Sequence, residues 1–162
     1  MRAKHQLAAE AIHIEQEILA ETVGSQDQVS AAYGGLNHIT FQTDGQWSVK
    51  PVTLSQDRLG DLESHLMLFY TGIKRTASDI ASSYVSDLQT ASSQMQDLGG
   101  MVAAGLSVLN GDGDLTQFGE LLHESWLIKR SLASVISNSE VDQIYNIARA
   151  SGAVGGKITG AG

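Results

Sequence analysis

The stretch Val23-Gly24-Ser25-Gln26-Asp27-Gln28-Val29-Ser30-Ala31-Ala32-Tyr33-Gly34-Gly35-Leu36-Asn37 decides how the first part of this chain folds. Gly24 favours a tight bend, and Gly34-Gly35 breaks the small-residue run that follows, because glycine ends helices and permits positive φ. We therefore predict a short helix that begins near residues 26 to 28 and ends at this glycine pair. Asp27 lies at its start, where backbone N–H groups favour an ionised carboxylate. That carboxylate could accept a proton or anchor a ligand, or it could only cap the helix.

The flanking residues predict a helix before this stretch and a β-hairpin after it. Apolar residues recur at helical spacing from about residue 6 to residue 20. Beyond the glycine pair, Ile39 and Phe41 alternate with polar neighbours, residues 43–46 indicate a turn, and Trp47 begins a returning strand. Pro51 places that strand at an edge or at its end, because proline donates no ladder hydrogen bond.

The second part of the chain is expected to be mostly helical. Residues 54–62 are polar and typical of a turn, so we place a domain boundary near residue 60. The apolar run 65–70 predicts a buried strand that Thr71-Gly72 ends. Apolar spacing then predicts helices over about residues 80–91, 95–109, 115–126 and 141–148, the last ended by Gly152, and a strand begins at Lys157.

Composition excludes several classes of function. The chain has 162 residues, 42% of them hydrophobic, and a net charge of −8 with scattered basic residues, which makes nucleic-acid binding improbable. It contains no cysteine, no signal-peptide pattern and no apolar run near the roughly 18 residues that a membrane helix needs. We expect a cytoplasmic protein without disulfides or thiolate metal sites. An anionic small substrate stays compatible with the charge, because a few local cations outweigh a distant field.

Four further motifs also have structural explanations. Asn110–Asp114 fails as a calcium loop, because leucines occupy the positions that need Gly and Glu, so it indicates a turn between helices. Gly155-Gly156-Lys157 fails as a P-loop, because Ile158 follows the lysine where Ser or Thr is needed. Thr71–Arg75 ends a predicted strand and opens a helix, so it is either an anion site or solvated surface charge. Lys129-Arg130 is placed at a solvent-facing or interdomain position.

Taken together, four segments carry a resemblance to a known family. Residues 24–37, residues 70–75 (Tyr-Thr-Gly-Ile-Lys-Arg), residues 122–132 (Leu-His-Glu-Ser-Trp-Leu-Ile-Lys-Arg-Ser-Leu) and residues 155–162 (Gly-Gly-Lys-Ile-Thr-Gly-Ala-Gly) occur in the matching order. The chain resembles GHMP superfamily kinases, and within them D-glycero-D-manno-heptose 7-phosphate kinases. The resemblance implies an α+β fold. Residues 1–60 would end a ribosomal-protein-S5-like catalytic domain, and residues 61–162 would form a helix-rich, ferredoxin-like C-terminal domain that is incomplete.

The same resemblance implies an ATP-dependent transfer of phosphate to the anomeric hydroxyl of a sugar or sugar phosphate. Asp27 would accept the proton of the attacking hydroxyl or orient it, and Arg75 would hold a substrate phosphate. The resemblance places Gln26, Gln28, Gly34 and Gly35 beside the sugar, and Gly160, Ala161 and Gly162 beside the nucleotide. Gln26, Gln28 and Asn37 could equally have ordinary structural roles. ATP and Mg²⁺ are the expected cofactors, with the Mg²⁺ ligands mainly outside this sequence.

The sequence departs from the family pattern at several points. It has no upstream Pro-x-Gly-x-Gly-Leu-Ser-Ser-type loop, and its third motif stops at Gly162, so we expect a fragment that is inactive by itself. Ser25 and Gln16 stand where Lys and Arg are common in heptose kinases, which leaves galactose, fucose and mevalonate kinases as alternatives. A different class also stays open, namely a truncated remnant or a helical interaction module in which Asp27 only caps a helix. Oligomeric state is left open.

Overall fold

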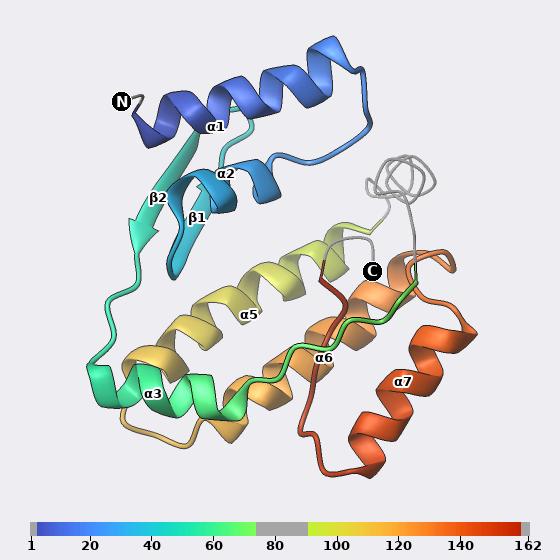
Figure 1. The fold of residues 1–162 in the computed structure, drawn as a ribbon. Helices are drawn as coiled ribbons and strands as arrows, with labels where there is room; N and C mark the ends of the chain where they lie inside the picture. Colours follow the sequence, from blue (N-terminus) through green and yellow to red (C-terminus); the bar gives the residue numbers. More distant parts are fainter. Residues whose placement is uncertain (1–2, 74–90, 160–162) are drawn as a thin grey trace. The chain divides into compact units, whose positions relative to one another are not determined.

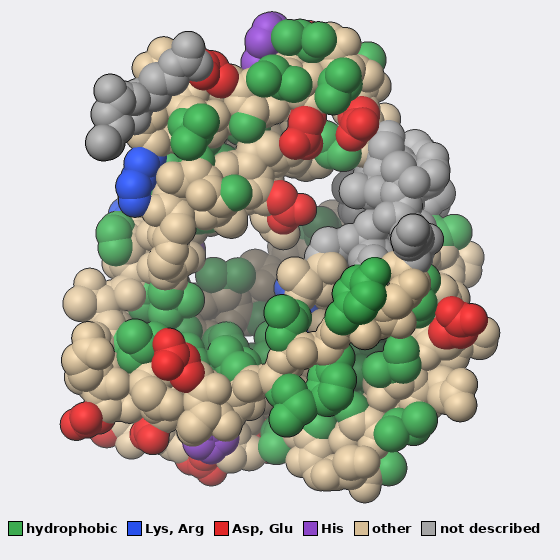
Figure 2. All heavy atoms as spheres, in the orientation of Figure 1, with side chains coloured by type: hydrophobic (Ala, Val, Ile, Leu, Met, Phe, Trp, Pro, Cys, Tyr) green, Lys and Arg blue, Asp and Glu red, His purple; other side chains and the backbone are tan. Residues whose placement is uncertain are grey.

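A computed structural model describes residues 3–73 and 91–159 and divides the chain into two compact units, Met1–Leu54 and Ser55–Gly162 (Figure 1). Each unit is described by itself. No helix within the described ranges is both long enough and apolar enough to cross a membrane. Acidic side chains are scattered over the surface in Figure 2 and basic ones are few, as the net charge of −8 requires.

The first unit begins with two helices packed against each other. Helix α1 spans Lys4–His13 and continues into a π-helical turn, η1, over Ile14–Ile18, and helix α2 spans Gln26–Tyr33. Ala8 of α1 and Val29 of α2 are fully buried. Gly34, with φ of 62°, ends α2. Both helices predicted from the sequence are therefore confirmed, the first with a π-helical end that its spacing did not indicate.

A two-stranded hairpin completes this unit. Strands β1, Asn37–Phe41, and β2, Trp47–Pro51, pair antiparallel with Ile39 opposite Val49. Gly45 has φ of 83° in the connecting turn, where the Gln42 N–H donates to the Gln46 carbonyl at 2.8 Å. Pro51 is the last residue of β2, so the predicted hairpin and the effect of its proline are both confirmed.

The second unit begins with a helix where the sequence suggested a turn. Helix α3 spans Gln56–His65, and its N-cap Ser55 accepts a hydrogen bond from the Arg58 N–H at 3.1 Å. The prediction of a polar turn over residues 54–62 was wrong. The helix there is mostly polar, and it packs on the unit through one buried residue, Leu62. The side chain of Arg58 then reaches three carbonyl oxygens near the end of the next described helix.

Three long helices form the rest of the unit: α5, Ser92–Asn110; α6, Thr116–Leu132; and α7, Ser139–Ala150. The turn between α5 and α6 contains Asp114, whose carboxylate accepts the Thr116 N–H at 2.8 Å, as expected for a helix-to-helix turn. The core is a cluster of Trp126, Ile136 and Val141. All three helices were predicted, whereas the helix predicted over residues 80–91 falls almost wholly outside the described residues.

Neither of the two strands predicted for this unit forms within the described residues. Residues 66–73 and 153–159 run without regular secondary structure, and Leu68 in the apolar run is 90% exposed, so the prediction of a buried strand there was wrong. Apolar composition alone does not make either segment a strand, because neither has a hydrogen-bonded neighbouring strand; within the described ranges the only strands are β1 and β2. Ile73 and Ile158, one from each segment, nevertheless pack against the Trp126 cluster. The described fold is thus mixed and helix-rich with one small sheet.

Candidate active site

The loop that leads into α2 is held by side chains of the preceding helical turn. The Gln16 amide, from η1, donates to the Val23 carbonyl at 2.9 Å and to the Ser25 hydroxyl at 3.2 Å. The turn itself is π-helical, with the Leu19 N–H donating to the Ile14 carbonyl at 2.9 Å, and such turns are frequent at functional sites. The start of α2 is therefore fixed by contacts within the first unit.

Asp27 lies in the first turn of α2 and is exposed. Its carboxylate accepts a long hydrogen bond of 3.4 Å from the neighbouring Gln26 amide. At this helix start Ser25 is the N-cap residue, and no side chain there makes a capping hydrogen bond. The carboxylate is thus accessible to a ligand from solvent, and its catalytic role stays a prediction.

Gln28 points into the unit, away from solvent. Gln28 is only 8% exposed, and its amide nitrogen donates to the Glu15 carboxylate of η1 in a short hydrogen bond. The amide oxygen Oε1 is buried without a hydrogen-bond partner among the described residues. Sequence reasoning missed Glu15, because thirteen residues separate it from Gln28 and no helical period relates the two.

The glycine pair after α2 leaves its surroundings open. Gly34 and Gly35 have φ of 62° and 75°, and a Cβ added at either would meet nothing within 4 Å. The Asn37 amide donates to the carbonyls of Gly34 at 2.8 Å and Gly35 at 3.2 Å, so Asn37 has a structural role in shaping this turn. A ligand can approach the backbone here without meeting a side chain of the pair.

The remaining predicted site residues lie in the second unit or beyond the described ranges. Gly72 has φ of 74°, and the Ile73 N–H donates to the Thr71 hydroxyl at 3.2 Å, which makes a tight turn. Arg75 and Gly160–Gly162 fall outside the described residues. Since Asp27 belongs to the first unit, its relation to these residues stays a prediction.

The segment leading to Gly160 lies against the backbone of α6. A Cβ on Gly155 would overlap the Gly119 carbonyl oxygen and lie 2.8 Å from the His123 nitrogen. One on Gly156 would lie 3.9 Å from the Tyr145 ring. Lys157 is exposed just after this contact. Gly155 is therefore required for this close packing, which explains it without a P-loop, whereas a Cβ on Gly156 would make only an ordinary contact.

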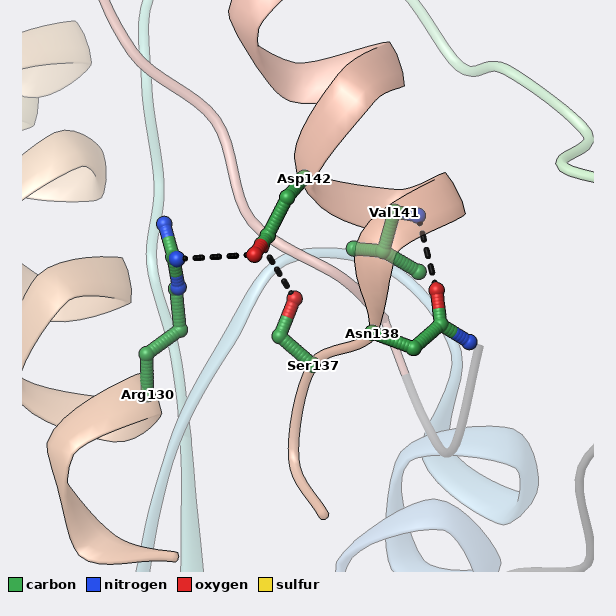
Figure 3. A network of polar contacts seen from close by, with 5 residues as sticks. All are labelled: Arg130, Ser137, Asn138, Val141 and Asp142. Carbon is green, nitrogen blue, oxygen red and sulfur yellow. Dashed lines mark hydrogen bonds and ion pairs between the residues drawn. The ribbon is translucent and has the colours of Figure 1, made fainter. Parts of the chain in front are cut away.

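Arg130 is partly buried in a polar network of the second unit, rather than fully facing solvent. Its guanidinium donates to the Asp142 carboxylate at 3.0 Å and lies 5.8 Å from the centre of the Trp126 ring. Figure 3 shows Asp142 also accepting from the Ser137 hydroxyl, at 2.6 Å, beside the Asn138 side chain that caps α7. This network joins the end of α6 to the start of α7.

The match to a known family lies within the second unit. Residues 95–162 match the profile of the family described as "GHMP kinases C terminal". This part of the chain is similar to the C-terminal region of GHMP kinases. The GHMP segment contains nearly all of α5, the whole of α6 and α7, and the Gly155–Lys157 contact on α6. The resemblance found in the sequence is thereby confirmed for the second unit.

A curated relative extends the likeness to the first unit. The D-glycero-alpha-D-manno-heptose 7-phosphate kinase of Campylobacter jejuni is 29% identical over 161 residues, which cover 98% of this chain and 47% of the relative. The chain thus spans about half the length of the curated relative it matches. The aligned region includes both the α2 site and the GHMP segment.

The described residues do not supply a metal centre. Across residues 3–73 and 91–159, no group of three or more His, Asp or Glu side chains is placed to hold a metal ion. Magnesium is preferentially bound by carboxylates together with substrate phosphates. The described side chains therefore do not form a Mg²⁺ site by themselves.

Proposed function

We propose that this chain carries the sugar-binding side of an ATP-dependent kinase that phosphorylates an anomeric hydroxyl, with D-glycero-D-manno-heptose 7-phosphate as the acceptor. The observation that carries the proposal is the alignment with the heptose 7-phosphate kinase along 98% of the chain, which runs through both units. The GHMP match in residues 95–162 supports the phosphotransfer class independently. A cytoplasmic location accords with ATP as co-substrate and with the absence of cysteine.

Asp27 is the residue we assign to the reacting hydroxyl. Its carboxylate would accept the hydroxyl proton, or orient that hydroxyl, as the oxygen attacks the γ-phosphate of ATP. Phosphoryl transfer depends chiefly on positioning and charge stabilisation, so an exposed carboxylate that is correctly positioned is sufficient. The fixed loop before α2 supports this role, because Gln16 holds the backbone on the N-terminal side of Asp27.

The neighbours of Asp27 would contact the rest of the sugar. Gln26 is exposed beside it, and the open backbone at Gly34 and Gly35 lets a ring approach closely. Gln28 would lie beneath the sugar, where its hydrogen bond to Glu15 holds the start of α2.

The acceptor phosphate and the nucleotide are assigned to the second unit. We propose that Arg75 binds the phosphate already on the substrate, because a guanidinium matches phosphate oxygens in a bidentate way. Gly160, Ala161 and Gly162 would lie beside the phosphates of ATP. Lys157, three residues before Gly160, is exposed and would add a positive charge near these phosphates.

We further propose how the parts correspond to domains. Residues 1–60 would be the end of a ribosomal-protein-S5-like catalytic domain, and residues 61–162 a ferredoxin-like C-terminal domain enriched in helices. Ile73 and Ile158 both pack on the Trp126 cluster, which supports placing the segments 66–73 and 153–159 in one domain. The observed division between Leu54 and Ser55 lies a few residues before the proposed boundary.

The test is a kinase assay on the product of the complete reading frame that contains this sequence. Transfer from Mg-ATP to heptose 7-phosphate should exceed transfer to galactose, fucose or mevalonate. Asp27→Asn should lower kcat by about 10²- to 10⁴-fold, the range for loss of a positioned proton acceptor. The matched control is Asp44→Asn in the β1–β2 turn, where asparagine keeps the oxygen that accepts the Gln46 N–H at 2.9 Å.

Two results would count against the proposal. Activity of Asp27→Asn equal to that of Asp44→Asn would remove Asp27 from the reaction. Absence of transfer to every sugar, with the fold intact by circular dichroism, would instead favour the helical interaction module.

A further inference from the structure

A histidine–tyrosine pair lies beneath the glycine segment and has no part in the function proposed above. His123 of α6 and Tyr145 of α7 share a hydrogen bond of 2.5 Å between Nδ1 and the hydroxyl oxygen. Their rings are nearly parallel, at 6°, with centroids 6.0 Å apart. Trp126 lies on the Tyr145 ring at 6.2 Å, so the phenol is held by two aromatic neighbours.

The direction of this hydrogen bond follows from the surroundings of the phenol. Burial raises the pKa of Tyr145 above its usual value, while the charges of Arg149 and Arg130 act weakly in the opposite direction. The hydroxyl therefore keeps its proton at neutral pH, and it is the donor of this hydrogen bond whenever Nδ1 carries no proton.

The segment that crosses the pair is anchored on both sides. The Arg149 guanidinium donates to the carbonyls of Ala153, at 2.8 Å, and Val154. On the other side Ile158 packs on the Trp126 cluster. Between these anchors, Gly155 meets the backbone at His123, and Gly156 lies over Tyr145.

We propose that His123 and Tyr145 are a positioning pair that holds Gly155 and Gly156 in one conformation against α6. By fixing these glycines, the pair sets where Lys157 meets a nucleotide phosphate. The positioning step rests on the packing, and the link to a nucleotide phosphate rests on the proposed kinase function. Neither residue touches a reacting atom, so neither is catalytic.

The positioning step is tested by NMR on the 162-residue chain. Tyr145→Phe keeps the ring and its aromatic contacts but removes the hydroxyl. We expect the amide order parameters of Gly155, Gly156 and Lys157 to fall from about 0.85 toward 0.6, while those of α5 stay unchanged. Tyr70→Phe, which removes a hydroxyl from a residue that is 88% exposed, is the matched control and should change none of them.

A rescue pair separates positioning from general loss of packing. His123→Asn places an amide oxygen near the position of Nδ1 and should preserve the order of the glycines, whereas His123→Leu should lose it. Histidine and asparagine have similar helix propensities, so α6 itself is little affected. Order parameters at Gly155 and Gly156 that are equal in wild type, Tyr145→Phe and His123→Leu would overturn the positioning role.

Titration of the same samples with Mg-ATP tests the link to the nucleotide. We expect the Lys157 amide resonance to shift in wild type, and the apparent affinity to be about three- to ten-fold weaker in Tyr145→Phe, in line with the loss of one hydrogen bond. No shift in wild type would refute the nucleotide link and leave the positioning step decided by the order parameters. Failure of the sugar-kinase proposal is separate, because it is read from acceptor phosphorylation.

Discussion

Substitution of Gly155 by alanine provides the sharpest test of the packing on α6. The added methyl would overlap the Gly119 carbonyl oxygen and lie 2.8 Å from the His123 nitrogen, and both atoms belong to helix backbone. Backbone cannot rotate away as a flexible side chain can, so the segment must lift from α6. Overpacking of this kind costs about 1–3 kcal/mol, and we take about 3 because both obstacles are rigid. Alanine also lowers the conformational entropy of the unfolded chain, which stabilises the folded state by about 0.7 kcal/mol. The free energy of unfolding should therefore fall by about 2 kcal/mol.

The assay is urea unfolding followed by the fluorescence of Trp126, which is 1% exposed. A Trp47→Phe background makes this indole the only one and restricts the signal to the second unit. For a chain of this length about 2 kcal/mol corresponds to a fall of about 4–8 °C in Tm.

Gly99→Ala is the matched control, since a Cβ there meets nothing within 4 Å in helix α5. It should stabilise by up to about 1 kcal/mol, as alanine does in helices. Equal free energies of unfolding for Gly155→Ala and wild type would show that the close approach of the segment to α6 is wrong.

Three other predictions concern contacts of the second unit. Arg58→Lys should lower the free energy of unfolding by about 1–2 kcal/mol in urea titrations, because one ammonium cannot replace hydrogen bonds to the carbonyls of Val108, Leu109 and Gly113. Asp142→Asn should cost about 0.2–1 kcal/mol, and less at high salt, since the Arg130 and Asp142 side chains are 31% and 34% exposed; an undiminished cost in 1 M salt (about a 3 Å screening length) would contradict an ionic origin. Because burial raises the pKa of Tyr145 in the folded chain, its contribution to stability is complete below the unfolded value of about 10 and is lost as pH rises through the folded pKa. Phenolate absorbance and unfolding measured above pH 10 should show this loss, and Tyr145→Phe should remove it.

The sequence was sufficient for the elements whose pattern is local. The helix that ends at Gly34, the hairpin with its terminal Pro51 and the three long helices were all predicted, because glycine, proline and helical spacing act within a few residues. Helix α3 was missed, because it buries a single leucine and its other residues are mostly polar, so its sequence shows no clear apolar stripe. The run 65–70 was predicted as a buried strand on composition alone, although a strand also needs a neighbour that composition cannot reveal.

The candidate site was predictable only in part. Asp27 was placed correctly in the first turn of a helix, since Gly24 and Gly34 bracket that helix in the sequence. The contacts of Gln28 with Glu15, and of His123 with Tyr145, join residues 13 and 22 positions apart. No period of a helix or strand relates such positions, so only the packing of one element on another reveals them.

The irregular segments of both units are held in the same way. Long polar side chains from neighbouring residues donate to backbone carbonyls: Gln16 to Val23, Asn37 to Gly34 and Gly35, and Arg149 to Ala153. Backbone outside helices and strands has carbonyls that need donors, and these amide and guanidinium groups supply them. The segments that lead to Asp27 and to Gly160 are therefore fixed before any ligand binds, as a preorganised site requires. It follows that Gln16 and Arg149 should influence ligand binding through the backbone they hold, although neither is assigned a contact with substrate.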